Sequence, residues 1–249
     1  MKKMIAISIV SHGHGAMVQA LVESLLNFSE VAKIIVTLNI PENLVFPNDS
    51  RILVLLNKSP KGFGENHNTA FQYCKEDFFC PLNPDVEFDI NPFPFLLAAM
   101  SDLQVGLVAP RVDSPIGGQE DSFRRFPTLF SLFLKILGGD DGRYILSSNT
   151  GVFSPDWVAG MFMLFRSQVF QQLRGFDEGF FLYYEDVDIS VRLWRSGHRI
   201  LACPNVIVYH DAQRDSHRKW RHLAWHLSSM ARYFVKYWGR LPRHSNTSH

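Results

Sequence analysis

Short apolar segments alternate with helical patterns through the first 110 residues of the chain. Each apolar run is four to eight residues long and ends in polar or turn-forming residues, which is typical of buried strands. After the first run, Met17, Leu21, Leu25 and Phe28 recur at the spacing of one helix face. Strands that alternate with helices in this way predict a mostly parallel sheet flanked by helices. The expected strands are residues 4–10, 33–38, 51–56, 77–82 and 105–110.

The second part of the chain begins with a long stretch of weak periodicity, residues 111–154, through which glycines such as Gly117, Gly118, Gly138, Gly139 and Gly142 are scattered. We interpret this stretch as a partly mobile insertion that holds one apolar helix, residues 129–137, because long irregular segments in compact domains are usually lids or disordered. Regular patterns then return, with strands at 157–165 and 200–209, the latter interrupted by Pro204. The expected helices are 64–75, 95–100, 167–173, 185–196 and 216–238.

The last expected helix, residues 216–238, combines aromatic and basic residues, which allows two interpretations. Aromatic and basic side chains together suit peripheral association with a membrane interface. They also suit a packing helix with a solvated opposite face, which is the interpretation we favour. The apolar residues on one face of this helix are Leu223, Leu227, Met230 and Phe234.

Composition and charge exclude several classes of protein. The chain has 249 residues with 46% hydrophobic content, enough for the core of one large α/β domain. The formal net charge of +1 gives no broad positive field that would indicate a nucleic-acid partner. We expect a single domain over residues 1–240, with a first half at 1–110, the insertion at 111–154 and a second half at 155–240, followed by a disordered tail at 241–249.

Three cysteines without C-x-x-C spacing favour a reduced compartment and no zinc finger. The apolar run at residues 4–10 is too short for a secretory signal, and no run reaches the roughly 20 apolar residues that span a bilayer. The sequence therefore predicts a cytoplasmic protein, at most at the inner face of the membrane.

Residues of types that bind ligands or metal ions follow or end several of these strands. Asp85 comes directly after the strand at 77–82, where Pro84 ends the ladder. An Asp there is either a simple turn-former or a ligand-binding group at the carboxyl edge of the sheet. His210 ends the last strand, and an Asp with a His suits a divalent cation whose other ligands are water or phosphate oxygens.

Three carboxylates stand within four residues at Glu185, Asp186 and Asp188, directly after an aromatic segment. Like charges this close disfavour simultaneous ionisation unless a cation or helix N-terminus compensates. The helix macrodipole accounts for one or two of the acids, and we favour a functional role for the group.

The motifs along the chain resemble those of a known family. In order they are Ser8-Ile9-Val10-Ser11, Lys61-Gly62-Phe63-Gly64 with Asn66 and Asn68, Leu82-Asn83-Pro84-Asp85-Val86, Arg124-Arg125-Phe126-Pro127-Thr128, Ala159-Gly160-Met161-Phe162-Met163-Leu164, Gly175-Phe176-Asp177-Glu178, Phe181-Leu182-Tyr183-Tyr184-Glu185-Asp186-Val187-Asp188, Pro204 and His210. Together they resemble the second family of inverting glycosyltransferases, and within it the bacterial rhamnosyltransferase-like branch. The resemblance covers residues 4 to about 238, and the Gly-Phe-Asp-Glu to Glu-Asp-x-Asp run is its most specific part.

The resemblance implies a GT-A fold, a Rossmann-like mostly parallel sheet flanked by helices, with an acceptor-side insertion and a C-terminal helix. It implies nucleotide-sugar binding by the half at 1–110, an acceptor-side role for the insertion at 111–154, and catalysis and acceptor binding by the half at 155–240. It implies Asp186 as catalytic base beside Glu185, Asp85 at the metal and diphosphate, and His210 completing a site for Mg²⁺ or Mn²⁺. Displacing a nucleoside diphosphate builds negative charge that such a cation stabilises. The residues implied to surround the donor are Ser11, His12, Asn39, Gly62, Phe63, Asn66, Asn68, Asn83, Asp85 and Gly160.

Two positions depart from the family pattern. Leu38 stands where the family usually has an Asp that contacts the nucleotide base, which leaves base recognition to Asn39, to the loop at Ser11 or to backbone groups. The family's Asp-x-Asp element is reduced to Asn83-Pro84-Asp85, a form common in the rhamnosyltransferase-like branch.

The resulting hypothesis is an inverting transfer of a sugar, with rhamnose favoured, from a dTDP- or UDP-sugar. The acceptor would be a hydroxyl of a bacterial surface polysaccharide such as O-antigen, or of a lipid-linked glycan. Two alternatives stay open. A sugar nucleotidyltransferase would need a basic phosphate loop after the first strand, and residues 11–15 contain no Lys or Arg. A non-catalytic sugar-nucleotide-binding scaffold would fit the missing base-contacting Asp.

Overall fold

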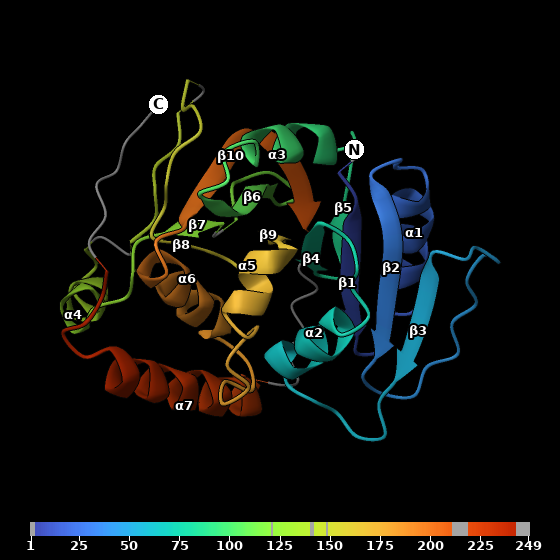
Figure 1. Cartoon of the computed structure of the whole chain (residues 1–249). Coiled ribbons are helices and arrows are strands. Elements are labelled where there is room, and N and C mark those ends of the chain that lie inside the picture. Colours follow the sequence, from blue (N-terminus) through green and yellow to red (C-terminus); the bar gives the residue numbers. More distant parts are fainter. Residues whose placement is uncertain (1–2, 121, 140–141, 148, 211–218, 243–249) are drawn as a thin grey trace.

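The computed structural model describes residues 3–120, 122–139, 142–147, 149–210 and 219–242 (Figure 1). Among these residues, one eight-stranded sheet has the strand order β3-β2-β1-β4-β9-β6-β10-β5, and β7 pairs with β8 separately. The strands are β1 (Ile5–Ser11), β2 (Val31–Leu38), β3 (Ile52–Leu56), β4 (Phe78–Leu82), β5 (Val86–Glu87), β6 (Val105–Asp113), β7 (Phe123–Arg124), β8 (Trp157–Val158), β9 (Leu164–Arg166) and β10 (Arg199–His210). The helices are α1 (Ala16–Leu26), α2 (Phe63–Phe71), α3 (Phe93–Ala99), α4 (Leu129–Ile136), α5 (Ser167–Gln172), α6 (Glu185–Arg195) and α7 (Lys219–Tyr237).

The expected mostly parallel sheet is confirmed. Strands β3, β2, β1 and β4 pair in parallel, as do β6 and β10, whereas β9 is antiparallel to both β4 and β6. Two successive antiparallel pairings restore the direction, so β6 and β10 point the same way as β1 and β4. The carboxyl ends of these strands therefore lie along one edge of the sheet, the edge at which open α/β sheets bind ligands.

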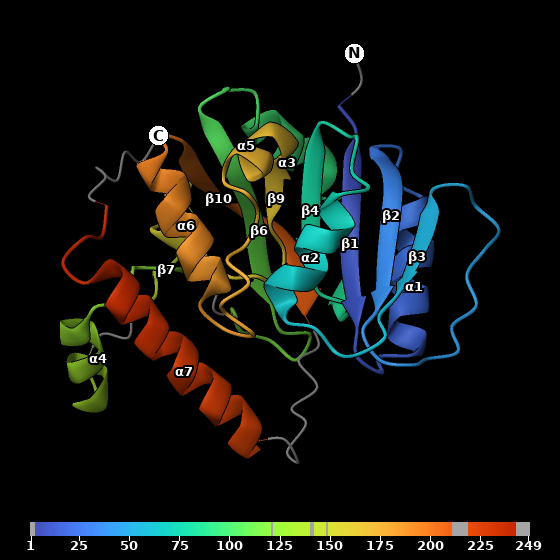
Figure 2. The same ribbon diagram turned by 60° about the horizontal axis from the view of Figure 1, so that its bottom comes forward.

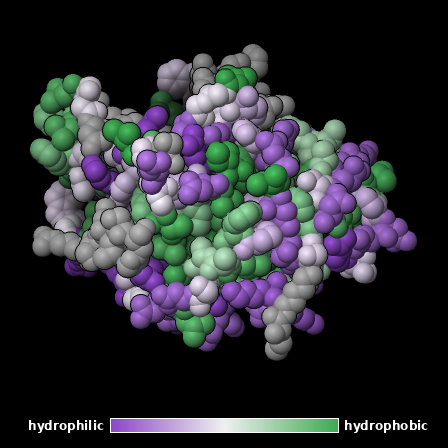
Figure 3. Space-filling model, turned by 90° about the horizontal axis from the view of Figure 1, so that it is seen from above, coloured by the Kyte–Doolittle hydropathy of each residue, from purple (hydrophilic) through white to green (hydrophobic). Residues whose placement is uncertain are grey.

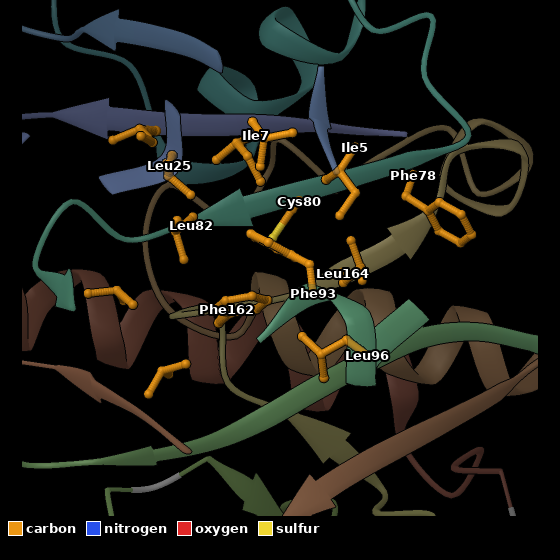
Figure 4. Close-up of a cluster of buried hydrophobic side chains, with 14 of the residues drawn as sticks. Ile5, Ile7, Leu25, Phe78, Cys80, Leu82, Phe93, Leu96, Phe162 and Leu164 are labelled. Atoms are coloured by element: carbon orange, nitrogen blue, oxygen red, sulfur yellow. The ribbon is translucent and has the colours of Figure 1, made fainter. Parts of the chain in front are cut away.

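Helices cover both faces of this sheet, with α2, α5 and α6 over one face and α1 and α3 over the other (Figure 2). Successive strand side chains point to opposite faces, so β1 contributes to both cores. Ile5 and Ile7 pack toward Leu25 of α1 and toward Phe93 and Leu96 of α3 (Figure 4). Ala6, between them in the sequence, packs in the second core with residues of α2, α5 and α6.

Two expected strands differ from the pattern that predicted them. Residues 157–165 form two strands instead of one, because β8 pairs with β7 while β9 pairs in the main sheet. The segment between them crosses from one sheet to the other and contains Gly160. The last strand, by contrast, continues past Pro204: its pairing with β6 shifts register between Cys203 and Ile207, so the proline sits in a bulge where no ladder hydrogen bond is required.

The C-terminal part packs as a separate layer. Helix α7 lies along α6, and Tyr233 and Tyr237 share a buried cluster with Phe180, Tyr184 and Val187 (Figures 1 and 2). The expected start of this helix at 216 lies outside the described residues, as do 243–249 of the expected tail. In the ranges given above, no helix has both the length and the apolar character needed to cross a bilayer.

Candidate active site

The carboxyl edge of the sheet gathers several of the residues that the sequence singled out. Ser11 ends β1, Asn39 follows β2, and Asn83 follows β4. His210 ends β10, which runs in the same direction. Residues that are up to 199 positions apart in the chain are thus brought to one side of the molecule.

Asp85 and His210 form a close pair at this edge. The antiparallel pairing of β5 with β10 places Val86 opposite His210, which brings the neighbouring Asp85 Oδ1 to 3.1 Å from His210 Nε2. The Asn83 side-chain amide nitrogen lies 3.4 Å from the same ring nitrogen. Among the described residues, neither Asp85 Oδ1 nor His210 Nδ1 has a partner with hydrogen-bond geometry, although both atoms are buried. Buried polar atoms of this kind are available to a cation or a donor group.

The three carboxylates of the acidic motif lie in the first turn of α6, but their surroundings differ. Asp188 is fully buried and saturated with donors: Arg192 Nε at 2.7 Å, Lys236 Nζ at 2.6 Å and the Tyr237 hydroxyl at 2.6 Å. Two cations and a hydroxyl stabilise its charge and leave no oxygen for a substrate. Asp188 is therefore a structural anchor between α6 and α7.

Asp186 is the partly exposed member of the motif. Its Oδ2 accepts a hydrogen bond from the Gly160 backbone at 3.1 Å, and its Oδ1 accepts one from the Val187 backbone at 2.8 Å. Desolvation raises the pKa of Asp186 from 3.8 to about 6, although these two amides and the nearby Arg124 guanidinium act to lower it. A carboxylate with this pKa is ionised at neutral pH and is basic enough to accept a proton.

Glu185 has the opposite environment. Its side chain is buried, Oε2 has no hydrogen-bond partner among the residues described, and burial together with the charges of Asp186 and Asp188 raises its pKa well above the ordinary value. A neutral Glu185 beside an ionised Asp186 avoids two adjacent charges in the same desolvated turn.

The segment Gly160–Met161 joins the two groups. The backbone nitrogen of Asn83 donates to the Met161 carbonyl at 2.9 Å, and the preceding Gly160 donates to Asp186. These two hydrogen bonds therefore connect the turn that carries Asp85 to the carboxylate of Asp186.

The two glycines at the start of α2, Gly62 and Gly64, have a packing role that the sequence alone did not indicate. A Cβ added at Gly62 would lie 2.7 Å from the Phe181 carbonyl oxygen, and one at Gly64 would lie 2.7 Å from Phe176 Cβ. Phe63, between the two glycines, is bonded to the same segment: its backbone nitrogen donates to the Phe181 carbonyl at 2.9 Å. The two glycines thus let α2 approach the segment that leads into α6.

Asn39 and Asn66 are buried and bonded to other protein groups. Asn39 Oδ1 accepts from the Lys61 backbone at 2.8 Å, and its amide nitrogen lies 2.7 Å from His12 Nε2. Asn66 donates to the Gly62 carbonyl at 2.9 Å. Asn57, which the sequence reasoning missed, donates to the side-chain oxygens of both, at 2.6 and 2.7 Å. The sequence could have indicated Asn57 by its position, because it directly follows β3 as Asn39 directly follows β2.

Two further sequence-predicted residues have other surroundings. Ser11 is buried beside the loop 12–15, where the missed residue Glu42 accepts from the Gly13 and Gly15 backbones at 2.7 and 3.2 Å. Asn68 bonds the Phe176 backbone at 2.8 and 3.0 Å and lines a cavity of about 790 Å³ that also includes Asp77 and Arg166. Asp77 precedes β4, so this cavity lies toward the amino ends of the parallel strands. The structure does not bring Asn68 together with Asp85.

The turn before α6 is strained. Tyr183 and Tyr184 have φ values of 70° and 66°, a left-handed conformation that costs a side-chain-bearing residue about 1–3 kcal/mol. Helix α7 holds this turn: the Tyr183 hydroxyl lies 2.8 Å from His222 Nδ1, and Ser229 donates to the Leu182 carbonyl at 2.8 Å. The left-handed turn at Tyr183 and Tyr184 sets the direction in which the chain enters the first turn of α6, where Asp186 lies.

Comparison with known proteins gives consistent matches. The family model described as "Glycosyl transferase family 2" matches residues 7–169, and "Glycosyltransferase like family 2" matches residues 146–232. The chain is 30% identical over 250 residues to "Rhamnosyltransferase WbbL" of Escherichia coli (strain K12), covering 94% of this chain and 93% of that protein. It is 27% identical to "N-acetylglucosaminyl-diphospho-decaprenol L-rhamnosyltransferase" of Mycobacterium tuberculosis, covering 70% of this chain and 60% of that protein.

Solved structures with the same fold have lower sequence identity. GalNAc-T7, solved with UDP, GalNAc and Mn²⁺, superposes with a TM-score of 0.73 at 18% identity, covering 95% of this chain and 48% of that one. The mannosyltransferase PcManGT from Pyrobaculum calidifontis, solved with GDP-Man and Mn²⁺, superposes with a TM-score of 0.64 at 14% identity, covering 94% and 65%. At these identities the likeness concerns the fold.

Proposed function

This chain belongs to glycosyl transferase family 2 and is a rhamnosyltransferase-like glycosyltransferase of the GT-A fold, and on that basis we propose that it moves a rhamnosyl group from a dTDP- or UDP-sugar to an acceptor hydroxyl. The acceptor belongs to a bacterial surface polysaccharide or a lipid-linked glycan. The names of the two rhamnosyltransferase relatives support the sugar, and dTDP is favoured by the resemblance to their branch.

The observation that carries the proposal is the environment of Asp186. Asp186 is a half-buried residue whose carboxylate is held by two backbone amides, and desolvation raises its pKa to about 6, which suits a general base. In the proposed reaction Asp186 takes the proton of the acceptor hydroxyl while that oxygen attacks the anomeric carbon. The bond from this carbon to the diphosphate oxygen breaks on the opposite face, and the nucleoside diphosphate leaves. One such displacement inverts the configuration at the anomeric carbon.

Asp85 and His210 are the residues proposed to hold Mg²⁺ or Mn²⁺. Oxygen and imidazole nitrogen ligands suit these cations, and both side chains have a buried atom without a hydrogen bond to any described residue. In the described ranges no third His, Cys, Asp or Glu joins them in a cluster, so diphosphate oxygens and water would complete the coordination. When bound, the cation would stabilise the negative charge that develops on the leaving diphosphate.

The remaining predicted donor residues divide into two groups in this proposal. The first group borders the carboxyl edge and would face the donor: Ser11 at the end of β1, Phe63 at the start of α2, and His12, Asn83 and Gly160 in loops. Asn39, Asn66 and Gly62 would act through the loop that they hold at Lys61, and Asn68 through the segment at Phe176. Glu185 would stay neutral beside Asp186, so that the turn does not hold two adjacent negative charges.

The proposal is tested by replacing Asp186 with Asn, which keeps the shape of the side chain and removes its basicity. We expect turnover of a rhamnosyl donor to fall by about 10²–10⁴-fold, the usual contribution of a general base, while donor affinity changes little. Product formation would be followed by release of the nucleoside diphosphate.

The matched control is Glu23→Gln, which removes an exposed carboxylate on α1 far from the site and should leave turnover unchanged. Unchanged turnover in Asp186→Asn would contradict the base assignment. Donor binding without turnover in the wild-type chain would favour the non-catalytic scaffold instead.

A further inference from the structure

Helix α7 presents an apolar stripe to solvent. Trp220 is 84% exposed, Val235 is 85% exposed and Trp238 is 68% exposed, while Leu223 and Leu227 are each about half exposed. The first four in sequence lie on one face of α7, and Trp238, which directly follows the helix, continues the same spacing. Ala224 and Ala231 lie on the same face and are exposed as well.

The opposite face of α7 packs on the protein through two tyrosines and several polar groups. Ser229 bonds the Leu182 carbonyl, Arg232 pairs with Asp177 at 3.0 Å, and Lys236 pairs with Asp177 and Asp188 at 2.5 and 2.6 Å. An ordinary surface helix turns its aliphatic face inward and its charged face to water. Helix α7 does pack on the protein, as the sequence favoured, with Met230 and Phe234 beside Tyr233 and Tyr237 in the buried cluster. The other two residues of the expected apolar face, Leu223 and Leu227, lie instead in solvent.

Helix α4 extends this apolar stripe. Its exposed side chains include Phe130 and Phe133, and Leu137 follows directly after the helix. A groove of about 400 Å³ connects the two helices and is lined by Leu129 of α4 and by Tyr233 and Trp238 of the α7 region. Hydrophobic residues gather where Figure 1 places α4, at the upper left of the face in Figure 3. We call the exposed residues of both helices the α4–α7 surface: Leu129, Phe130, Phe133, Leu137, Trp220, Leu223, Leu227, Val235 and Trp238.

Exposed basic side chains flank the described part of the α4–α7 surface. Neither α4 nor α7 contains an Asp or Glu. Arg221, in the first turn of α7, and Arg240, three residues after the helix, are both exposed, whereas Arg232 and Lys236 pair with Asp177 and Asp188 on the packed face. Two copies of this chain that met through α7 would bring like charges together, which disfavours self-association. Anionic lipid headgroups would complement the same charges, and tryptophans at both ends of an apolar stripe are typical of the headgroup boundary.

We propose that the α4–α7 surface docks onto an anionic lipid bilayer, with the apolar stripe at the headgroup boundary and the arginines among the phosphates. The inference goes beyond the transfer reaction, because it needs neither donor nor acceptor. It also gives α7 two roles, since the same helix holds the turn before Asp186 through His222 and Ser229.

The test is sedimentation of the full chain with vesicles of phosphatidylcholine alone or with roughly one third phosphatidylglycerol. We expect binding to the anionic vesicles, weakened by high salt because the headgroup attraction is screened. The double variant Trp220→Ser/Trp238→Ser should bind at least about tenfold more weakly, the equivalent of about 1.4 kcal/mol. Tryptophan fluorescence should shift to shorter wavelength on binding in the wild-type chain and not in this variant.

The matched control is Leu103→Ser/Ile116→Ser, which removes two equally exposed apolar residues outside the α4–α7 surface, 76% and 98% exposed. It should bind like the wild-type chain, and unchanged circular dichroism would show that both variants are folded. Absent binding to anionic vesicles, or equal binding by all three proteins, would overturn the proposal. So would a lipid-free dimer that the Trp220→Ser/Trp238→Ser variant alone abolishes, because a second copy would then cover the stripe. None of these readouts requires turnover, so they are independent of the proposed reaction.

Discussion

At the scale of single residues, burial and neighbours assign different roles to three adjacent acids. Asp188 is neutralised by Arg192 and Lys236, Glu185 is buried with a pKa well above its ordinary value, and Asp186 is only half-buried, with a pKa raised to about 6. The residue type is nearly the same in each case. The difference arises from which side of the first turn of α6 each side chain occupies.

The pKa of Asp186 predicts the acid limb of the pH profile. The carboxylate is the active form, so kcat/KM should be constant above about pH 6 and fall tenfold per pH unit below it. An ordinary Asp would place this limb near pH 4. Initial rates between about pH 4.5 and 8, with an acid-stability control at each pH, would measure it. A profile that stays flat down to about pH 4.5 would contradict proton transfer to Asp186.

At the scale of elements, α7 is the support of the proposed catalytic turn. Its side chains contact the segment 177–188 at Asp177, Phe180, Leu182, Tyr183 and Asp188. The strained turn at Tyr183 and Tyr184 therefore depends on a helix that lies some 40 residues further along the chain.

Replacing Lys236 with Met should weaken this support. Partial burial would raise the pKa of Asp177, but the Lys236 hydrogen bond and nearby charges lower it from 3.8 to about 2. A lowered carboxylate pKa contributes stability above the unfolded value of 3.8, and this contribution is lost as the pH falls toward 2. Solvent screens the partly exposed Asp177, and Arg192 and Tyr237 still compensate Asp188. We therefore expect Lys236→Met to reduce the free energy of unfolding by only about 1–3 kcal/mol at pH 7.

Urea denaturation at pH 7 and near pH 3 would measure this effect, and the difference from the wild-type chain should shrink at the lower pH. The control is Lys58→Met, an exposed lysine after β3, which should leave stability within about 0.5 kcal/mol. Equal stability of Lys236→Met and the wild-type chain at pH 7 would show that Lys236 does not support α7 and that its other contacts suffice.

At the scale of the whole molecule, the sheet assembles the proposed metal and donor site from distant parts. Asp85 and His210 are 125 positions apart and meet because β5 pairs with the end of β10. Ligand that binds only the folded chain raises its melting temperature.

We therefore expect dTDP or UDP to raise the melting temperature in the presence of Mn²⁺ or Mg²⁺ and to do so less in their absence. His210→Ala and Asp85→Ala should each reduce the metal-dependent part of the shift, because each removes one of two proposed protein ligands. Thermal denaturation with each nucleotide, with and without a chelator, would measure this shift. An equal nucleotide shift with and without metal in all three proteins would contradict the cation site.

Much of this arrangement was predictable from local signals. The alternation of strands and helices predicted the parallel sheet, and motifs placed after strands predicted the edge at which Asp85 and His210 meet. The sequence did not predict the split of residues 157–165 into β8 and β9, because both strands form one apolar run and their separation depends on which sheet each joins. Asn57 and Glu42 were missed for a similar reason: their role comes from partners that are distant in the sequence.

The order of residues was enough to specify the fold class, the family and the acidic motif, because periodicity, turn residues and motif spacing are local properties of the chain. Which acid of the motif stays accessible, and which face of α7 is buried, became evident only in the folded molecule. Both depend on contacts between distant elements: Gly160 holds Asp186, Lys236 neutralises Asp188, and Tyr233 and Tyr237 pack against the segment before α6. An amphipathic pattern shows that a helix has two faces, whereas the aromatic and acidic partners beneath it decide which one meets the solvent.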